Sequence, residues 1–320
     1  MREGLRAVAA RLGRAPVFCA GFSGGLDSTV LLDLLAPACK EEGYALRALH
    51  VHHGLSANAD AWERHCAAVC AGLRVPLQVV HVAVSRAPRT SLEEEARRAR
   101  HAAFADVAAD AIVLAHHADD QAETVLLQLL RGAGPKGLAG MPRIKSLAAG
   151  ASTLLLRPLL DFPRNALLEH AQARGLAWIE DESNRDDRLK RNFLRNQVFP
   201  VLRTGFPAPA QTLARAARLQ AEAAALLDAL ADNDLAQAAA GAALEVEKLK
   251  LHDDARLKNL LRRWFDRAAL RQPSEARLDA LLRALRDSSN DTRLRWEHEG
   301  VSVVRQKGLL CLETGASDPT

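Results

Sequence analysis

A chain of 320 residues is long enough for two domains, and its hydrophobic content of 48% excludes general disorder. The formal net charge of +4 is mildly basic, which permits an RNA partner without requiring one. The sequence shows five irregularly spaced cysteines, no signal-peptide pattern and no apolar stretch of membrane-spanning length. These features predict reduced thiols and a cytoplasmic protein with no membrane partner.

The first half of the chain alternates short apolar runs with longer helical ones. Strands are expected at residues 17–22, 46–51, 77–82, 111–115 and 153–157, with helices near 28–40, 58–72, 91–109 and 119–131. This alternation predicts an α/β fold, a doubly wound parallel sheet covered by helices on both faces. Ligands of such sheets bind at the carboxyl ends of the strands, where the polar motifs of this chain lie.

The segment at 205–209 is rich in glycine and proline and interrupts this pattern. An alanine-rich helix is expected at 210–235. A smaller basic unit follows, with helices near 253–269 and 274–287 and strands at 292–298, 301–305 and 309–312. We therefore divide the chain into a first domain at 1–205, a helical linker at 206–242 and a small α+β domain at 243–320.

The segment Ser23-Gly24-Gly25-Leu26-Asp27-Ser28 follows the first strand and opens a helix. Backbone N–H groups and the positive end of a helix dipole meet at such a turn, which favours phosphate binding. The glycines permit close approach of the backbone, and the two serine hydroxyls add donors. Asp27 repels phosphate, so we expect it to hold a Mg²⁺ that bridges to the phosphates. The alternative is a tight turn without a ligand.

Histidines follow the second strand and are expected beside this loop. Three of them suggest zinc, but successive strand residues face opposite ways, so His50 and His52 do not converge easily with His53. We expect His52 and His53 to contact a nucleotide by packing and hydrogen bonding. Metal ligation stays the alternative.

An acidic and basic helix is expected from residue 91. Ser91, three residues before Glu94, predicts a capped start, and Glu93 with Arg97 is typical of a solvated helix with ion pairs. Arg97 and Arg100 lie one turn apart. The same helix can therefore also direct two cations toward the strand ends where phosphates bind.

The run from Leu114 to Thr124 repeats the strand-to-helix pattern with carboxylates at the helix start. A solvated helix cap is the alternative for Asp119 and Asp120. Glu123 lies within an apolar run, where burial without a partner is unfavourable. A cationic substrate or Mg²⁺ would supply that partner.

Two cationic segments are candidates for phosphate contact. Arg131 and Lys136 lie in a glycine-rich loop whose alternative interpretation is a simple helix end. Arg188, Arg191 and Arg195 follow a spacing that places them on one helix face, which suits an RNA backbone. An ordinary solvated basic face is the alternative.

The motifs SGGLDS, HVHHGL, EEEARRAR, HHADDQAET, RGAGPKGL, RPLL and EDESNRDDRLKRNFLRNQVFP occur in this order over about residues 17–203. Together they resemble the tRNA(Ile)-lysidine synthetase family, a branch of the pyrophosphate-loop (PP-loop) ATP pyrophosphatases. The resemblance implies that ATP adenylates carbon 2 of the wobble cytidine in the CAU anticodon of tRNA(Ile). L-Lysine then displaces AMP through its ε-amino group, and the codon read changes from AUG to AUA.

The resemblance also implies roles for particular residues. ATP binding falls to Ser23, Gly24, Gly25, Leu26, Asp27, Ser28, His52 and His53. Catalysis falls to Asp27, which holds Mg²⁺, and to Arg97, Arg100 and Glu123. Lysine binding falls to Asp27, Asp120 and Glu123, and which carboxylate acts as the base stays open. Binding of tRNA falls to Arg131, Lys136, Arg188, Arg191, Asn192, Arg195, Arg262 and Arg263.

The unit from 243 to 313 resembles the family's first C-terminal domain, a tRNA-contacting module, more weakly. Its candidate phosphate contacts are Arg256, Lys258, Arg262 and Arg263, with surface charge as the alternative. Longer members carry a further C-terminal domain, so this chain is expected to be either a short form or a truncated one. The oligomeric state, including a homodimer, stays open.

Two other functions compete with lysidine formation. A related tRNA thiolase also adenylates a base but delivers sulfur, which needs reactive cysteines or an iron–sulfur cluster. Cys66 and Cys70 are poor candidates, because they fall within a helix and lack the C-x-x-C spacing. The other competitor is a non-catalytic RNA-binding module.

Overall fold

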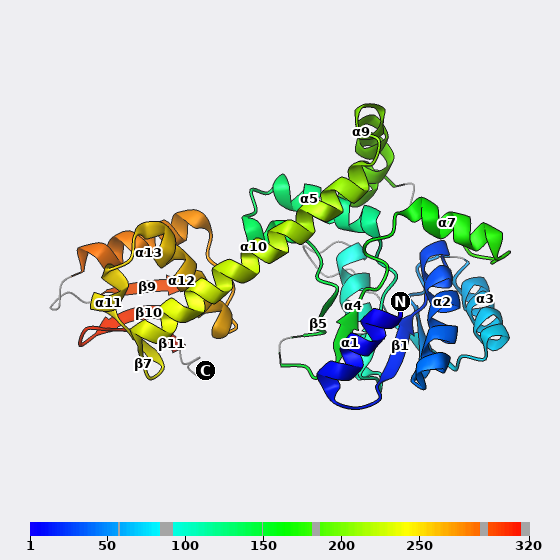
Figure 1. Ribbon diagram of the computed structural model, residues 1–320, viewed down its shortest axis with the longest axis horizontal. Coiled ribbons are helices and arrows are strands. Elements are labelled where there is room, and N and C mark those ends of the chain that lie inside the picture. The colour runs from blue at the N-terminus through cyan, green and yellow to red at the C-terminus, as the bar shows by residue number, and fades with distance from the viewer. Residues whose placement is uncertain (57, 84–91, 149, 181–185, 289–293, 315–320) are drawn as a thin grey trace. The chain divides into compact units, whose positions relative to one another are not determined.

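The computed structural model describes residues 1–56, 58–83, 92–148, 150–180, 186–288 and 294–314 (Figure 1). The chain divides into two compact units, Met1–Ala221 and Glu222–Thr320, with the division inside helix α10 (Pro209–Ala238). The three-part division expected from the sequence stays a prediction. Two sequence expectations, the helix cap at Ser91 and the acidic run at 181–184, lie outside the described residues.

Within the described residues, six strands form one sheet in the first unit. They are β1 (Val17–Gly21), β2 (Ala45–His52), β3 (Leu77–His81), β4 (Ala111–Val113), β5 (Ile144–Ser146) and β6 (Leu154–Leu156). Their order is β3-β2-β1-β4-β6-β5, and all neighbours pair in parallel except β5 with β6. The expected parallel α/β fold is confirmed, whereas the antiparallel edge strand β5 was not expected.

The helices of this unit cover both faces of the sheet. The helices of this unit as far as residue 173 are α1 (Arg2–Leu12), α2 (Leu26–Glu42), α3 (Ala59–Leu73), α4 (Leu92–Asp106), α5 (Ala118–Leu129), α6 (Pro135–Leu138) and α7 (Arg164–Ala173). Alternate residues of β1 enter different cores, as strand geometry requires. Phe18 and Ala20 pack with α1, α2, α3 and α7, while Cys19 packs with Phe104 of α4. In Figure 1, α2 lies next to β1.

The chain reverses its direction of winding at β1. This strand pairs with β2 on one side and with β4 on the other, so the connections leave it in opposite directions. A crevice opens at such a switch point, at the carboxyl ends of the strands. The glycine-rich turn after β1 and the acidic helix start after β4 therefore meet at one place.

The basic segment after residue 185 differs from the expected single helix. It forms α8 (Lys190–Phe193), a π-helical turn (Leu194–Val198) and α9 (Phe199–Gly205). Arg188 precedes α8, and the wider π turn changes the direction of the side chains that follow. The three arginines therefore do not share one regular helix face.

The second unit packs helices against an antiparallel sheet. Its elements after α10 are β7 (Ala239–Ala240), β8 (Ala243–Glu245), α11 (Val246–Lys250), α12 (Asp254–Arg267), α13 (Glu275–Asp287), β9 (Arg295–His298), β10 (Val301–Gln306) and β11 (Leu309–Thr314). The strand order is β7-β8-β11-β10-β9. Leu257, Phe265, Leu281 and Val303 are buried in its core. Within the described parts of the chain, no helix combines the length and apolarity needed to cross a membrane.

Candidate active site

The glycine-rich turn after β1 has a backbone that only glycine fits. Gly24 has a φ of +80°, and a Cβ there would lie 2.9 Å from both Cys66 Sγ and Ile179 Cδ1. Gly25 is the N-cap of α2, so the unpaired N–H groups of the first turn of α2 begin here. The hydroxyls of Ser23 and Ser28 lie 3.1 Å apart, and Ser28 Oγ donates to Gly25 O at 3.0 Å. The turn therefore presents backbone N–H groups and two serine hydroxyls at the N-terminus of α2 without needing to rearrange.

The chain after α7 holds this turn in place. Ile179 N donates to Gly24 O at 2.9 Å, and Ile179 forms an isolated parallel bridge with Gly25. Two segments distant in sequence therefore share backbone hydrogen bonds at the turn. This pairing fixes the position of the N–H groups without a side-chain cap.

A cleft of about 1080 Å³ opens at the turn, within the first unit. From the turn it is lined by Ser23, Gly25, Leu26, Asp27 and Ser28. Its other sequence-predicted lining residues are His53, Arg97, Arg100, Asp120, Arg131, Arg191 and Arg195. The structure therefore brings most of the expected ATP, catalytic and cationic residues to one cleft.

Asp27 carries an oxygen that fits a hard cation. Its Oδ2 lies 3.6 Å from His117 Nε2. Its Oδ1 is buried and, within the described residues, has no hydrogen-bond partner, although Arg164 Nε approaches to 3.7 Å. An orphaned carboxylate oxygen beside a phosphate-binding turn suits Mg²⁺, which takes oxygen ligands.

His117 lies among three carboxylates and was given no role by sequence reasoning. It is the N-cap of α5 and is 1% exposed, and its ring accepts from Asp120 N. Its Nε2 lies 3.4 Å from Asp120 Oδ2, and its Nδ1 lies 3.8 Å from Asp119 Oδ2. Burial disfavours the charged ring, but Asp27, Asp120 and Asp119 outweigh burial and raise the pKa of His117. Its position directly before the acidic helix start was the available signal.

The cationic partner of Glu123 is an arginine of the chain itself. The Glu123 side chain is 1% exposed, and Arg195 Nε donates to its Oε1 at 2.8 Å. Arg195 Nη2 also donates to Asp120 Oδ1 at 3.2 Å. Burial raises the pKa of Glu123 even though Arg195 opposes the shift. The expectation that Glu123 needs a partner is met by an arginine, so an incoming ammonium must approach carboxylates that already hold a guanidinium.

Another part of the cleft is strongly cationic. Arg97 and Arg100 of α4 line it together with Arg157, which is 6% exposed. Burial, and then the charge of Arg97, lower the pKa of Arg157 to about 10. Arg157 Nε donates to His116 Nδ1 at 3.3 Å, and burial lowers the pKa of His116 to about 4, so this ring is neutral at pH 7. Sequence reasoning quoted the RPLL motif of Arg157 without giving that arginine a role.

The two expected nucleotide histidines point to different places. His53 lines the cleft, and its Nδ1 is buried without a hydrogen-bond partner in the described residues. Burial and then Arg100 lower its pKa. His52 is not among the described lining residues of the cleft, and its Nε2 lies 3.1 Å from Asp60 Oδ1. An ATP-binding role for His52 stays a prediction.

The expected tRNA contacts are likewise divided. Arg131 and Arg191 line the cleft, and Arg191 Nη2 donates to Thr124 Oγ1 at 3.1 Å. The described lining of the cleft does not include Lys136, Arg188 or Asn192. Arg188 is 90% exposed and forms an ion pair with Asp186, while Asn192 Nδ2 donates to Asp186 O.

In the second unit, most of the candidate phosphate contacts are engaged in ion pairs. Arg256 pairs with Asp234, Arg263 pairs with Asp232 and Asp228, and Lys258 pairs with Asp279. Arg262 is exposed. These pairs stabilise the unit, and their roles toward tRNA stay predictions.

The cysteines offer little for sulfur chemistry. Cys19, Cys39, Cys66 and Cys70 are buried free thiols. Burial raises the pKa of Cys66 to about 12 and that of Cys70 to about 11, which suppresses the reactive thiolate. The thiolase alternative therefore gains no support from these residues.

Comparisons with known proteins place this fold in a class. The PP-loop domain family matches residues 5–202, and the TilS substrate binding domain family matches residues 244–311. The U34-tRNA thiolase NcsA from Methanococcus maripaludis with its [4Fe-4S] cluster superposes with a TM-score of 0.51 at 20% identity. The superposition covers 68% of this chain and 79% of the thiolase, and it shows a shared fold alone. The first unit is a PP-loop domain.

The curated relatives are tRNA(Ile)-lysidine synthases. That of Pseudomonas putida is 46% identical over 92% of this chain and 70% of its own length. Those of Chromobacterium violaceum and Alkalilimnicola ehrlichii are 46% and 47% identical over 87% and 86% of this chain, and over 65% and 63% of their own lengths. The chain belongs to the tRNA(Ile)-lysidine synthase family of ATP-using PP-loop ligases and spans about two thirds of the length of these relatives. The family expected from the motifs is confirmed.

Proposed function

We propose that the chain adenylates the O2 atom on carbon 2 of the wobble cytidine in tRNA(Ile) with a CAU anticodon and then joins L-lysine to carbon 2. The product is lysidine, which reads AUA instead of AUG. One observation carries the proposal: a single cleft holds a phosphate-binding turn, Asp27 and a set of arginines, and Asp120 with Glu123 behind it lies at the same cleft.

In the first step the cytosine O2 attacks the α-phosphorus of ATP, and the bond to the β-phosphate oxygen breaks to release diphosphate. The turn at residues 23–28 binds phosphate through N–H groups and hydroxyls. Arg97 and Arg100 balance negative charge that develops around the α-phosphate. Asp27 would hold Mg²⁺, which when bound neutralises phosphate charge.

In the second step the ε-amine of lysine attacks carbon 2, and AMP leaves with the electron pair of the bond that breaks. The amine must first lose a proton, because an alkyl ammonium has no lone pair. Asp27 and Asp120 both line the cleft, and we assign to these carboxylates the binding of the ammonium and the acceptance of its proton. Glu123 lies behind Arg195, so it acts through the charge and position of that arginine.

Contact with tRNA is assigned to cations near the cleft and in the second unit. Arg131 and Arg191 line the cleft and can meet phosphates that flank the wobble base. Lys136, Arg188, Asn192, Arg262 and Arg263 are proposed as outer contacts. We also propose that the reaction takes place in the cytoplasm, where a tRNA substrate is available.

The test measures AMP and diphosphate release from ATP with purified chain and transcribed tRNA. We expect AMP release only when L-lysine and tRNA(Ile) with cytidine at the wobble position are both present, because without lysine the AMP stays on the tRNA. Replacing that cytidine by uridine is the matched control, and it should abolish release. Release of ADP, or sulfur incorporation in place of lysine, would overturn the proposal.

A further inference from the structure

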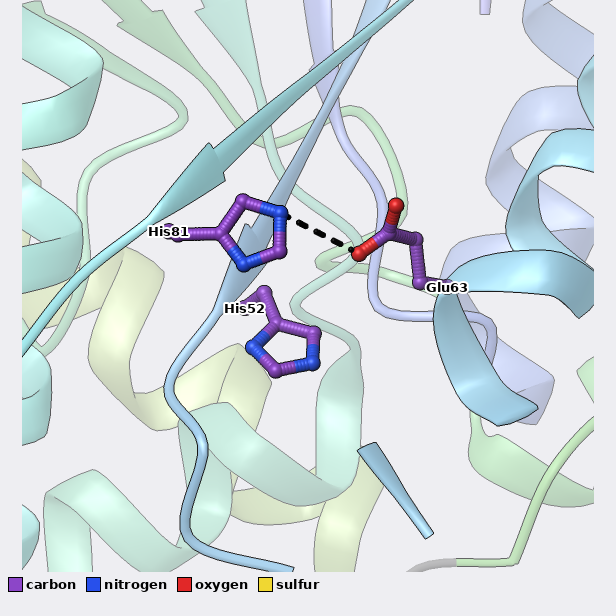
Figure 2. Close-up of side chains that lie close together, drawn as sticks. All are labelled: His52, Glu63 and His81. Atoms are coloured by element: carbon purple, nitrogen blue, oxygen red, sulfur yellow. Dashed lines mark ion pairs between the residues drawn. The ribbon is translucent and has the colours of Figure 1, made fainter. Parts of the chain in front are cut away.

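Three metal-ligating side chains lie together beside the cleft. Ligand atoms of His52, Glu63 and His81 all lie within 4.8 Å of one another. Figure 2 shows the two imidazoles close together, with the Glu63 carboxylate beside His81. In the described part of the chain, these residues are not among those that line the cleft. The cluster is therefore separate from the site described above.

Regular elements hold all three residues. His52 and His81 end β2 and β3 and are partners in the parallel register. Register partners project to the same face of a sheet, so the two rings meet with centroids 4.6 Å apart. Glu63 comes from α3. Two strand ends and a helix therefore place the three side chains without a loop in the donor set.

We propose that His52, Glu63 and His81 bind a Zn²⁺ ion. Two imidazoles and one carboxylate are a donor set that zinc prefers, and three protein ligands leave a fourth position for water. Mg²⁺ and Ca²⁺ take oxygen ligands, so the two imidazoles disfavour both ions. The buried thiols nearby add no donor to this set.

One separation in the cluster already matches zinc coordination. Ligand atoms about 2.1 Å from a tetrahedral zinc are about 3.4 Å apart. His81 Nε2 and Glu63 Oε2 are already 3.4 Å apart. One ligand atom from each of the three residues lies within 4.8 Å of the other two, so side-chain rotations are needed to bring the whole set to zinc distances. His81 is 65% exposed and Glu63 is 32% exposed, which leaves room for those rotations and for entry of the ion.

A further carboxylate supports the imidazole of His52. Asp60 Oδ1 lies 3.1 Å from His52 Nε2. This hydrogen bond fixes the tautomer and the orientation of the His52 ring. Asp60 is therefore a positioning residue for the metal, and it lies one helical turn from Glu63 on α3.

A bound Zn²⁺ joins three elements at one edge of the sheet. β3 is the edge strand, and the ion ties its end to β2 and to α3. His53, the residue after His52, lines the cleft. The ion therefore also stabilises the end of β2 from which His53 enters the cleft. The proposal goes beyond lysidine formation and does not depend on it.

Metal binding by the full chain tests the proposal. The chelator-treated protein is titrated with Zn²⁺ by calorimetry, and Co²⁺ serves as a spectroscopic probe. We expect one site with a dissociation constant in the micromolar range or tighter, and a tetrahedral cobalt spectrum without thiolate charge transfer. His81→Ala and Glu63→Gln should each weaken binding at least about tenfold, and Asp60→Asn should weaken it about tenfold.

Matched controls separate this site from scattered surface ligands. His252→Ala removes a partly exposed histidine in the second unit, and Glu41→Gln removes an exposed helical glutamate; both should bind zinc as the unaltered chain does. Circular dichroism checks that each variant is folded. The proposal is overturned if the unaltered chain binds no zinc, if His81→Ala and Glu63→Gln bind it equally well, or if cobalt reports thiolate ligands.

Discussion

At the scale of single residues, Arg195 supplies the positive charge that compensates two carboxylates at the cleft. It holds the buried Glu123 and the cleft residue Asp120 at the same time. Removing one partner of a buried pair leaves a charge without compensation, which is strongly unfavourable. Arg195 is therefore a structural residue as well as a candidate contact for tRNA.

Arg195→Ala should lower the free energy of unfolding by about 3 kcal/mol, because Glu123 loses its partner. Adding Glu123→Gln to this variant should restore part of the loss, since the buried charge is then gone. Urea unfolding at pH 7 measures both variants. If the double variant is as unstable as the single one, Glu123 is not the reason for the loss.

At the scale of elements, the turn between β1 and α2 carries the site. Gly24 is needed for two distinct reasons, a left-handed backbone and the absence of a side chain. Gly43, at the other end of α2, has a φ of +72° but open space around it. A substitution there therefore tests the backbone strain without the steric clash.

Gly24→Ala should abolish measurable ATP-dependent AMP formation, because its Cβ would displace Cys66 or Ile179 and so deform the phosphate-binding turn. Gly43→Ala should cost about 1 kcal/mol of stability from backbone strain and leave AMP formation unchanged. Radiolabelled ATP turnover and urea unfolding measure the pair. Equal activity of the two variants would remove the steric argument.

Elements also show what the sequence could and could not predict. The turn at 23–28 was predictable because its signal lies in six consecutive residues after an apolar strand. His117, Arg157 and Arg164 acquire their places through burial and through contacts with distant segments, which a local pattern does not contain. The antiparallel pairing of β5 and the π turn at Leu194–Val198 likewise depend on packing after the chain has folded.

In the whole molecule, charge has to serve both tRNA binding and the stability of each unit. Arg131 and Arg191 line the cleft and are proposed to contact tRNA phosphates. Arg256 instead pairs with Asp234, whose side chain is fully buried. The two groups of arginines should therefore respond differently to salt and to pH.

Arg131→Ala combined with Arg191→Ala should reduce the salt dependence of tRNA binding by about one to two units of slope. Arg6→Ala, at an exposed arginine that pairs with Glu42 and has no proposed tRNA contact, is the matched control and should leave the slope unchanged. Filter binding across a salt series measures the slopes. An unchanged slope in the double variant would show that Arg131 and Arg191 do not contact tRNA phosphates.

Arg256→Ala should lower the urea midpoint at neutral pH. The Arg256 hydrogen bond, opposed by burial, lowers the pKa of Asp234 from 3.8. The stabilisation from this pair is present above pH 3.8 and is lost as the pH falls through the lowered pKa. Urea unfolding between pH 7 and pH 3 should show the two proteins converging at the acid end; a constant difference would contradict the assignment.

Transfer of the α-phosphate to tRNA tests the central claim most directly. ATP labelled in its α-phosphate is incubated with Mg²⁺, tRNA(Ile) bearing the CAU anticodon and the full chain, without lysine. We predict label on the wobble cytidine with the unaltered chain and none with Asp27→Asn, which should still bind tRNA. Label that remains in ADP, or that reaches tRNA equally in both proteins, would contradict an adenylating cleft built around Asp27.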